Sequence, residues 1–291
     1  IKEVLIAITV QNDYTAANKI LDAIGIARFN ELFKEMGLKE TVLKHRLIRT
    51  ELKENEEKNC STSYELSKCF ELLYKKAMDY NPNIIVFPEL CIQGICSPEI
   101  IYKTSEVIPG YSSNIICELS KKYNIYSVVG ISEKNGNKFY NSSMLINNNG
   151  NILGVYRKVH LWDVENRVFS NGKEYSVYNT DFGKVAMWIC YDTRFPEVAR
   201  ILALKGARVS FVPAAWLSRD VKHWKKLLSS RSLDNFMYVC GADEIVDTEL
   251  HQAIGVSTIV NPEGDIISEA KFRTEGLIYS ELDLSIVDNL R

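Results

Sequence analysis

Glu89, Lys158 and Cys190 each follow a short apolar run, and together they could carry out acyl transfer. Such β-prone runs predict strands, so all three side chains are expected close to the end of a strand. A thiol nucleophile needs a base to take its proton, and the intermediate it forms at a carbonyl needs a cation or N–H donors for its oxygen. Glu89 and Lys158 have the chemistry for these two functions.

The residues around Cys190, VAMWICYDTRFPE, favour a reactive thiol at a turn from a strand to a helix. The apolar run Val185–Ile189 ends at Cys190, and Phe195-Pro196-Glu197 suits the start of a helix. Proline fits a first helical position because the N–H that it lacks would be unpaired there anyway. Backbone N–H groups and the positive end of a helix dipole favour a thiolate and can hold an oxyanion.

Each of the three residues also has an ordinary interpretation. A glutamate or a lysine after a strand is commonly solvated, and a cysteine after an apolar run commonly packs in the core. In combination the motifs are more specific. FPEL at 87–90, YRKVHL at 156–161 and ICYDTRFPE at 189–197 resemble, in this order, the Glu-Lys-Cys signature of the nitrilase superfamily of carbon–nitrogen hydrolases. The resemblance runs from about Phe70 to the C-terminus and includes Tyr140-Asn141-Ser142.

This resemblance implies a role for each motif residue. Cys190 would be the nucleophile, Glu89 the general base and later the acid, and Lys158 the cation that stabilises the oxyanion. The family often adds a second glutamate, which matches Glu165 in ENRVFSNG; the alternative for Glu165 is a loop charge. Asp192 is expected to brace the turn at the nucleophile. Residues expected to bind substrate or the oxyanion are Tyr191, Tyr140, Trp216 and Arg194, with Arg194 also a candidate brace.

His160 is a tempting base but is expected to be structural, because the Glu-Lys-Cys scheme already assigns the proton transfers. The expected reaction is hydrolysis of a small linear amide through a cysteine thioester, as in the omega-amidase branch. A nitrile or an N-carbamoyl substrate remains open. The alternatives are a weakened or inactive nitrilase-fold protein with a binding or regulatory role and, more remotely, a β-lactam-recognising serine hydrolase fragment.

Strand and helix signals alternate after Asn81-Pro82 and predict an α/β domain with several antiparallel pairs. The expected strands are 84–87, 126–130, 143–146, 152–156, 185–189, 209–212, 237–241, 257–260 and 277–282, and the expected helices 113–123, 197–205 and 224–235. The family resemblance implies a four-layer α-β-β-α sandwich. We expect a carbon–nitrogen hydrolase domain over 76–291, preceded by a mainly helical N-terminal segment over 1–75.

The segment 1–75 resembles a helical part of class A β-lactamase-like serine hydrolases. It has Asn12-Asp13-Tyr14 where that family has Ser-Asp-Asn, and the catalytic Ser-x-x-Lys is absent. Without that serine and lysine, the usual β-lactam chemistry is not expected. Periodicity does not decide between strand and helix at Ile1–Val10. The chain is therefore a fusion joined within Ser61–Met78, or Ile1–Val10 is the first strand and residues 11–60 are an insertion.

Composition and charge limit the classes of partner that can be expected. A net charge of −2 gives no reason to expect nucleic acid or an anionic membrane as a partner. No apolar run approaches the roughly 20 residues of a membrane helix, and no signal-peptide pattern is present. Seven cysteines without a CxxC pair favour a reduced, cytoplasmic compartment. We expect no metal and no other cofactor, a small-molecule amide substrate, and, from the resemblance, a homodimer or a higher homo-oligomer.

Overall fold

The computed structural model describes residues 2–9, 11–12, 26–28, 30–35, 37, 39–40, 42, 63–95, 97–217, 221–247 and 252–291. The sequence also predicts amphipathic helices over Ala16–Gly25 and Ile26–Gly37 and a charged surface loop over Lys39–Asn59. The first of these helices and most of the loop lie outside the described residues. Helix is present at 26–28 and 30–35, within the helix expected over Ile26–Gly37.

The first of two six-stranded sheets has the order β15-β1-β3-β4-β5-β6. Its strands are β1 (Lys2–Thr9), β3 (Ile84–Val86), β4 (Tyr126–Asn135), β5 (Lys138–Ile146), β6 (Ile152–Arg157) and β15 (Gly276–Asp283). Strands β1, β3 and β4 run parallel, whereas β15, β5 and β6 pair with their neighbours in antiparallel fashion. The sheet is therefore mixed.

The beginning of the chain belongs to this sheet. Strand β1 pairs in parallel with β3, with Leu5 opposite Ile84, and antiparallel with β15, with Leu5 opposite Ser280. Periodicity leaves Ile1–Val10 undecided, and the structure shows that Lys2–Thr9 form a strand of this sheet. The apolar pattern of this segment fits either period, and the backbone pairing along both edges decides in favour of a strand.

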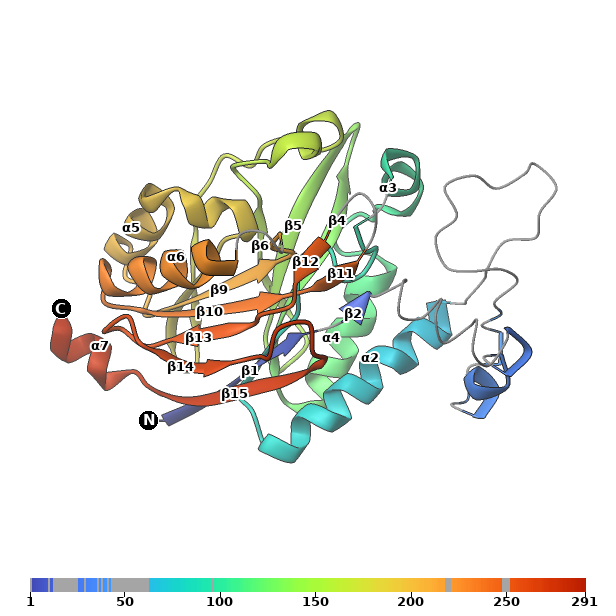
Figure 1. Ribbon diagram of the computed structural model, residues 1–291, viewed down its shortest axis with the longest axis horizontal. Coiled ribbons are helices and arrows are strands. Elements are labelled where there is room, and N and C mark those ends of the chain that lie inside the picture. The colour runs from blue at the N-terminus through green and yellow to red at the C-terminus, as the bar shows by residue number, and fades with distance from the viewer. Residues whose placement is uncertain are drawn as a thin grey trace.

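The second sheet has the order β14-β13-β10-β9-β8-β7, with β8, β9 and β10 parallel (Figure 1). Its strands are β7 (Val177–Thr180), β8 (Gly183–Met187), β9 (Val209–Ala214), β10 (Tyr238–Asp243), β13 (Thr258–Val260) and β14 (Ile266–Glu269). A small third sheet joins β12 (Gln252–Ile254), β11 (Ile245–Asp247) and β2 (Gln11–Asn12).

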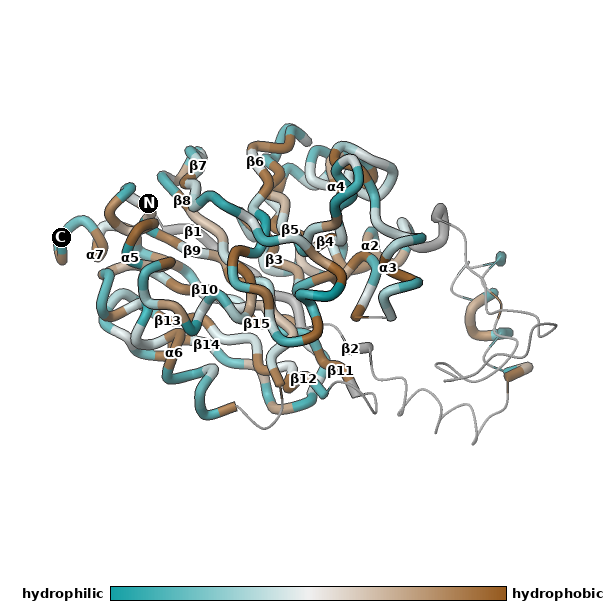
Figure 2. Tube along the Cα trace, turned by 90° about the horizontal axis from the view of Figure 1, so that it is seen from above, coloured by the Kyte–Doolittle hydropathy of each residue, from teal (hydrophilic) through white to brown (hydrophobic). Residues whose placement is uncertain are grey.

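The two large sheets pack face to face, and helices cover their outer faces. Helices α2 (Ser63–Ala77) and α4 (Tyr111–Tyr123) cover the first sheet, and α5 (Pro196–Leu204) and α6 (Val221–Leu233) cover the second (Figure 1). In β3, Ile84 packs in the core shared with the second sheet, whereas Ile85 packs with α2 and α4. Both faces of β3 are buried, which explains its uninterrupted apolar run. Figure 2 shows hydrophobic segments along the strands and hydrophilic ones in many connections.

The elements expected after Asn81-Pro82 are all present, with ends shifted by a few residues. The turns at 148–151 and 261–265 join antiparallel pairs, β5 with β6 and β13 with β14. The sequence reasoning missed short elements such as β7, β14, α3 (Pro98–Thr104) and α7 (Ser285–Leu290), because each is too short for a periodic signal. Among the described residues, no helix is both long and apolar enough to cross a membrane.

Candidate active site

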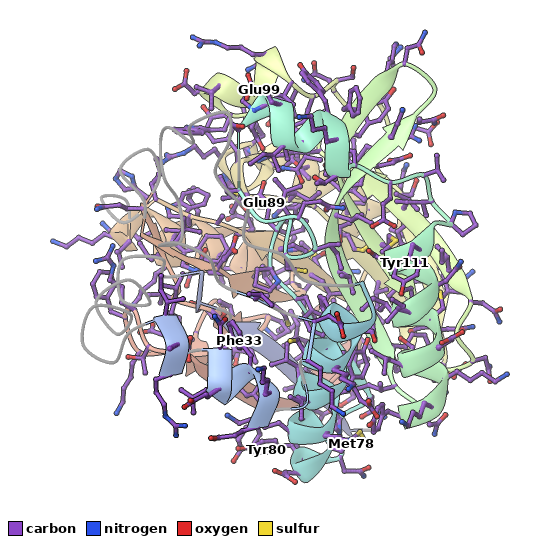
Figure 3. All side chains as sticks on the ribbon, turned by 90° about the vertical axis from the view of Figure 1, so that its right-hand side faces the viewer. Phe33, Met78, Tyr80, Glu89, Glu99 and Tyr111 are labelled. Carbon is purple, nitrogen blue, oxygen red and sulfur yellow. The ribbon has the colours of Figure 1, made fainter. Side chains whose placement is uncertain are left out.

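Glu89, Lys158 and Cys190 converge at the ends of strands, as the sequence predicted. Glu89 follows β3, Lys158 follows β6, and Cys190 begins the short 3-10 helix η3 (Cys190–Arg194) after β8. Their exposed fractions are 3%, 2% and 8%. Figure 3 shows Glu89 well inside the molecule, while Glu99 and Tyr80 lie nearer its edge. Two charged side chains this deeply buried require partners.

The ammonium group of Lys158 lies between two carboxylates. Its Nζ donates to Glu89 Oε1 at 2.7 Å and lies 2.8 Å from Glu165 Oε2 and 3.0 Å from Glu165 Oε1. Glu165 belongs to the 3-10 helix η2 (Asp163–Arg167), and its Oε2 accepts the backbone N–H of Trp162 at 2.6 Å. Glu165 is thus part of the buried cluster and not a solvated loop charge.

Asn141 joins the same cluster, although the sequence reasoning gave it no role. Its Nδ2 donates to Glu89 Oε1 and to Glu165 Oε1, each at 2.7 Å. Asn141 lies in β5 with an exposed fraction of 1%. The available signal was the Tyr140-Asn141-Ser142 motif, which is part of the family resemblance and directly precedes the strand expected at 143–146.

The second oxygen of Glu89 faces the connection after β9. Glu89 Oε2 accepts the backbone N–H of Ala215 at 2.9 Å, and the next N–H, that of Trp216, donates to Asp243 Oδ1 at 2.8 Å. The Ala215 N–H also interacts with the Cys190 thiol. The backbone at Ala215 therefore lies against both the thiol and the carboxylate.

The turn at Cys190 is held by Asp192. Cys190 has φ of 43°, a left-handed conformation that is unfavourable for a non-glycine residue and needs support from its surroundings. Asp192 accepts hydrogen bonds from the Tyr156 hydroxyl and the His160 backbone N–H, both at 2.8 Å. The His160 ring lies 2.8 Å from Asp192 Oδ1 through Nδ1 and stacks on Phe195 with centroids 3.6 Å apart. These contacts are structural ones, in keeping with what the sequence led us to expect of Asp192 and His160.

Burial and neighbouring charges set the protonation of the cluster. Burial raises the pKa of the Cys190 thiol, and the Glu89 carboxylate raises it further, which favours the neutral thiol. Burial opposes ionisation of Glu89, but the charge of Lys158 and hydrogen bonds from Lys158 and Asn141 outweigh it and lower the pKa. Burial disfavours the ammonium of Lys158, yet Glu165 and Glu89 hold its pKa well above the usual range. Burial raises the pKa of Glu165 despite the charge of Lys158.

Three of the residues expected to bind substrate or the oxyanion lie close to Cys190. The Arg194 guanidinium lies 5.0 Å from the ring centre of Trp216 and 5.9 Å from that of Tyr191. Tyr140 lies elsewhere. It precedes Asn141 in β5 and therefore points to the opposite face, where the Arg157 guanidinium lies 4.2 Å from its ring. A contact between Tyr140 and substrate stays a prediction, and the structure places this side chain apart from the Glu89–Lys158–Cys190 cluster.

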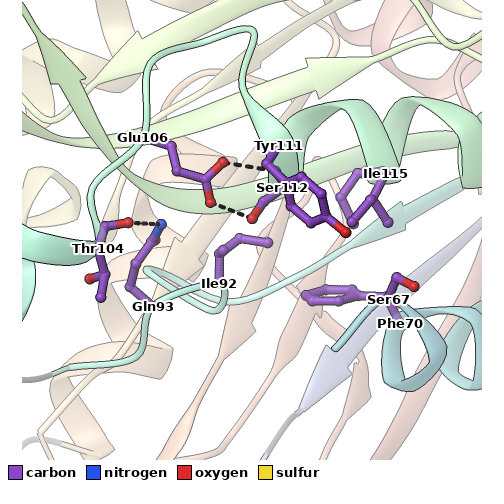
Figure 4. A pocket seen from close by; sticks show the side chains of 10 residues that line it. Ser67, Phe70, Ile92, Gln93, Thr104, Glu106, Tyr111, Ser112 and Ile115 are labelled. Atoms are coloured by element: carbon purple, nitrogen blue, oxygen red, sulfur yellow. Dashed lines mark hydrogen bonds between the residues drawn. The ribbon is translucent and has the colours of Figure 1, made fainter. Parts of the chain in front are cut away.

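A separate pocket of about 300 Å³ lies near the N-terminal end of α4 (Figure 4). It is lined by Ser67, Phe70, Ile92, Gln93, Thr104, Glu106, Tyr111, Ser112, Ile115 and Ile116. Glu106 accepts hydrogen bonds from Ser112. The side chain of Gln93 donates a hydrogen bond to the Thr104 carbonyl and accepts one from the Ser132 backbone N–H. The pocket contains no member of the Glu-Lys-Cys cluster, and the hydrogen bonds of its charged side chain are already satisfied within the protein.

Two observations bear on metals and disulfides. The described residues contain no group of three or more His, Cys, Asp or Glu side chains that could hold a metal ion. The cysteines at 69, 91, 117, 190 and 240 carry free thiols.

Comparison with known proteins assigns the chain, with its two mixed sheets and its buried Glu89–Lys158–Cys190 cluster, to a family. The chain belongs to the carbon–nitrogen hydrolase family, whose profile matches residues 51–291. A second profile, that of the β-lactamase enzyme family, matches residues 1–82. Both resemblances seen in the sequence are thereby confirmed.

The relatives place the chain in the omega-amidase branch of the nitrilase superfamily. It is 34% identical to omega-amidase NIT2 of Danio rerio, covering 76% of this chain and 83% of the relative. The identity to omega-amidase NIT3 of Saccharomyces cerevisiae is also 34%, over 75% and 81% of the two chains. The crystal structure of Saccharomyces cerevisiae Nit3 matches with a TM-score of 0.75 and 26% identity, covering 100% of this chain and 93% of that one.

Proposed function

We propose that the protein hydrolyses the terminal amide of a small linear carboxylic acid through a thioester on Cys190. One observation carries the proposal: the buried Lys158 ammonium is held between Glu89 and Glu165, and Glu89 shares the Ala215 N–H with the Cys190 thiol. In this proposal Cys190 is the nucleophile, Glu89 the base and Lys158 the cation that stabilises the oxyanion, and the proximity of the three side chains supports these roles. The similarity to omega-amidases supports the same reaction.

In the first half of the reaction, Glu89 takes the proton of the Cys190 thiol as sulfur attacks the amide carbonyl. This transfer is needed because burial keeps the thiol neutral, while Lys158 keeps Glu89 ionised. Lys158 and the backbone N–H of Tyr191 stabilise the negative oxygen of the tetrahedral intermediate. The C–N bond then breaks, the leaving nitrogen takes the proton from Glu89, and ammonia departs.

In the second half, Glu89 takes a proton from water and the resulting hydroxide attacks the thioester. The second intermediate collapses with cleavage of the C–S bond, and Glu89 returns its proton to sulfur. Glu165 holds Lys158 in place in both halves and is itself fixed by the Trp162 N–H. The site returns to its starting protonation, so one water is consumed for each ammonia released.

The arginine beside the nucleophile supports a substrate with a carboxylate at its far end. The guanidinium of Arg194 rests against the rings of Trp216 and Tyr191, which orient it next to the turn that carries Cys190. A planar guanidinium suits two-point binding of a carboxylate. Monoamides of short dicarboxylic acids, such as succinamate, would combine such a carboxylate with a terminal amide. A cytoplasmic location and a homodimer stay predictions.

Replacement of Cys190 by alanine tests the proposal. Ammonia release from succinamate should be lost in Cys190→Ala. It should be retained in Cys240→Ala, because Cys240 is also a buried thiol but lies in β10, in the hydrophobic core. Full ammonia release by Cys190→Ala would refute the proposed nucleophile. If the unmodified protein releases no ammonia from any small amide or nitrile and Cys190 resists alkylation, a binding or regulatory role is favoured instead.

A further inference from the structure

The side-chain amide of Asn141 closes a ring of four polar atoms in the buried cluster. Asn141 Nδ2 donates to Glu89 Oε1 and Glu165 Oε1 at 2.7 Å each. Lys158 Nζ contacts the same two oxygens, at 2.7 and 3.0 Å. A primary amide has two N–H groups, and both of them are used here. Asn141 therefore bridges two carboxylates that would otherwise meet only at the lysine.

The bridge suits an amide because it adds no charge. Glu89 and Glu165 repel one another, and Lys158 supplies one positive charge between them. A neutral double donor satisfies both oxygens, whereas an aspartate would add a third negative charge to a site with almost no access to water. Asn141 Oδ1 is buried and accepts no hydrogen bond among the described residues. The amide is thus oriented by the two carboxylates alone.

The backbone of Asn141 links the bridge to the lysine. The Lys158 N–H donates to the Asn141 carbonyl at 2.9 Å, continuing the pairing of β5 with β6. This backbone hydrogen bond fixes residues 141 and 158 relative to one another, independently of the contacts that their side chains make with the carboxylates. The two side chains that donate to Glu89 Oε1 therefore belong to residues whose backbones are hydrogen-bonded to each other.

The bridge decides which oxygen of Glu89 can accept a proton. Oε1 already has two donors, Lys158 and Asn141, whereas Oε2 has the Ala215 N–H. That N–H also interacts with the Cys190 thiol, and the thiol is itself a hydrogen-bond partner of Glu89. We infer that Asn141 is a positioning residue, which holds Glu89 through Oε1 so that Oε2 receives the Cys190 proton. This inference rests on the proposed function.

Asn141→Leu tests the inference, because leucine has nearly the same volume and no donors. The carboxylate of Glu89 would lose a hydrogen bond that favours its charged form, so its pKa should rise. The acid limb of kcat/KM against pH should move up by about one pH unit, and kcat should fall about tenfold to a hundredfold with little change in KM. The kcat of Asn141→Asp should be lower still, because this substitution adds a carboxylate to the site.

Other titratable groups around Glu89 must be considered in reading the pH profile. They are Lys158 after β6, Glu165 in η2, Cys190 in η3, and Asp243 at the end of β10. The acid limb is therefore a property of the coupled cluster. The alkylation rate of Cys190 by iodoacetamide, measured across pH, gives a second readout that needs no turnover and should show the same upward displacement.

Asn235→Leu is the matched control. Asn235 is also a buried asparagine, with Nδ2 donating to the Arg231 carbonyl and Oδ1 without a partner in the described structure. Its replacement should lower thermal stability and leave the shape of both pH profiles unchanged. A folded Asn141→Leu with the wild-type kcat, or with a lowered kcat and unmoved acid limbs, overturns the positioning role. If no variant or parent releases ammonia, the proposed function fails, and the alkylation profile still tests the bridge.

Discussion

Replacement of Lys158 by methionine should show how strongly the buried ion cluster depends on its one cation. Methionine keeps most of the aliphatic volume and removes the ammonium that contacts Glu89 at 2.7 Å and Glu165 at 2.8 Å. At these distances Coulomb's law gives about 6 kcal/mol of attraction for each contact at an effective dielectric constant of ~20. Burial of the ammonium costs several kcal/mol in return. The free energy of unfolding near pH 8 should therefore fall by about 3–5 kcal/mol, as for other buried pairs that lose one partner.

The loss should depend on pH. In the parent protein the pKa of Lys158 is raised in the folded state, so its contribution is complete at any pH below the ordinary lysine pKa. In the variant, Glu89 and Glu165 remain buried without the cation, so their folded-state pKa values rise above the unfolded ones. Such groups destabilise the fold increasingly as pH rises above the unfolded value of about 4.3. The deficit should thus be smaller at pH 5 than at pH 8.

Urea unfolding of parent and variant at pH 5 and pH 8 measures both effects. Lys122→Met is the control, because Lys122 also contacts a glutamate, Glu71 at 2.6 Å, but is 57% exposed. An exposed ion pair is worth at most about 1 kcal/mol, so this control should change little at either pH. If Lys158→Met costs no more than Lys122→Met, or costs the same at both pH values, the cluster is not held together by the lysine charge.

Two further predictions concern substrate and chemistry. Arg194→Met should raise KM for succinamate at least about tenfold and leave KM for a neutral amide such as butyramide nearly unchanged, because only succinamate has a carboxylate to bind. Steady-state kinetics with both substrates measures the effect, with Arg200→Met on the exposed side of α5 as the control. Equal changes in KM for both substrates would contradict the prediction. A fluorescent penicillin should acylate no serine despite the β-lactamase family match over residues 1–82, because that segment lacks the Ser-x-x-Lys motif; a labelled band on a denaturing gel would show otherwise.

The sequence by itself determined the local features of this protein. Apolar runs such as Val185–Ile189 predict strands because burial on both faces requires apolar side chains at every position. Glu89, Lys158 and Cys190 stand where such runs end, so their place at the edges of the sheets could be predicted from the order of residues alone. The local residue types likewise predict the start of α5 at Pro196.

Only the tertiary structure decided questions that depend on residues far apart in the chain. Lys2–Thr9 is a strand because β15 and β3 pair with its two edges, and one of these partners lies at the opposite end of the chain. Glu165 became part of the site because Lys158 and Asn141 reach it. The side chains of adjacent residues in β5 point to opposite faces of the sheet, so Asn141 contacts the carboxylates and Tyr140 contacts Arg157. The sequence motif alone does not say which of these two neighbours faces the site.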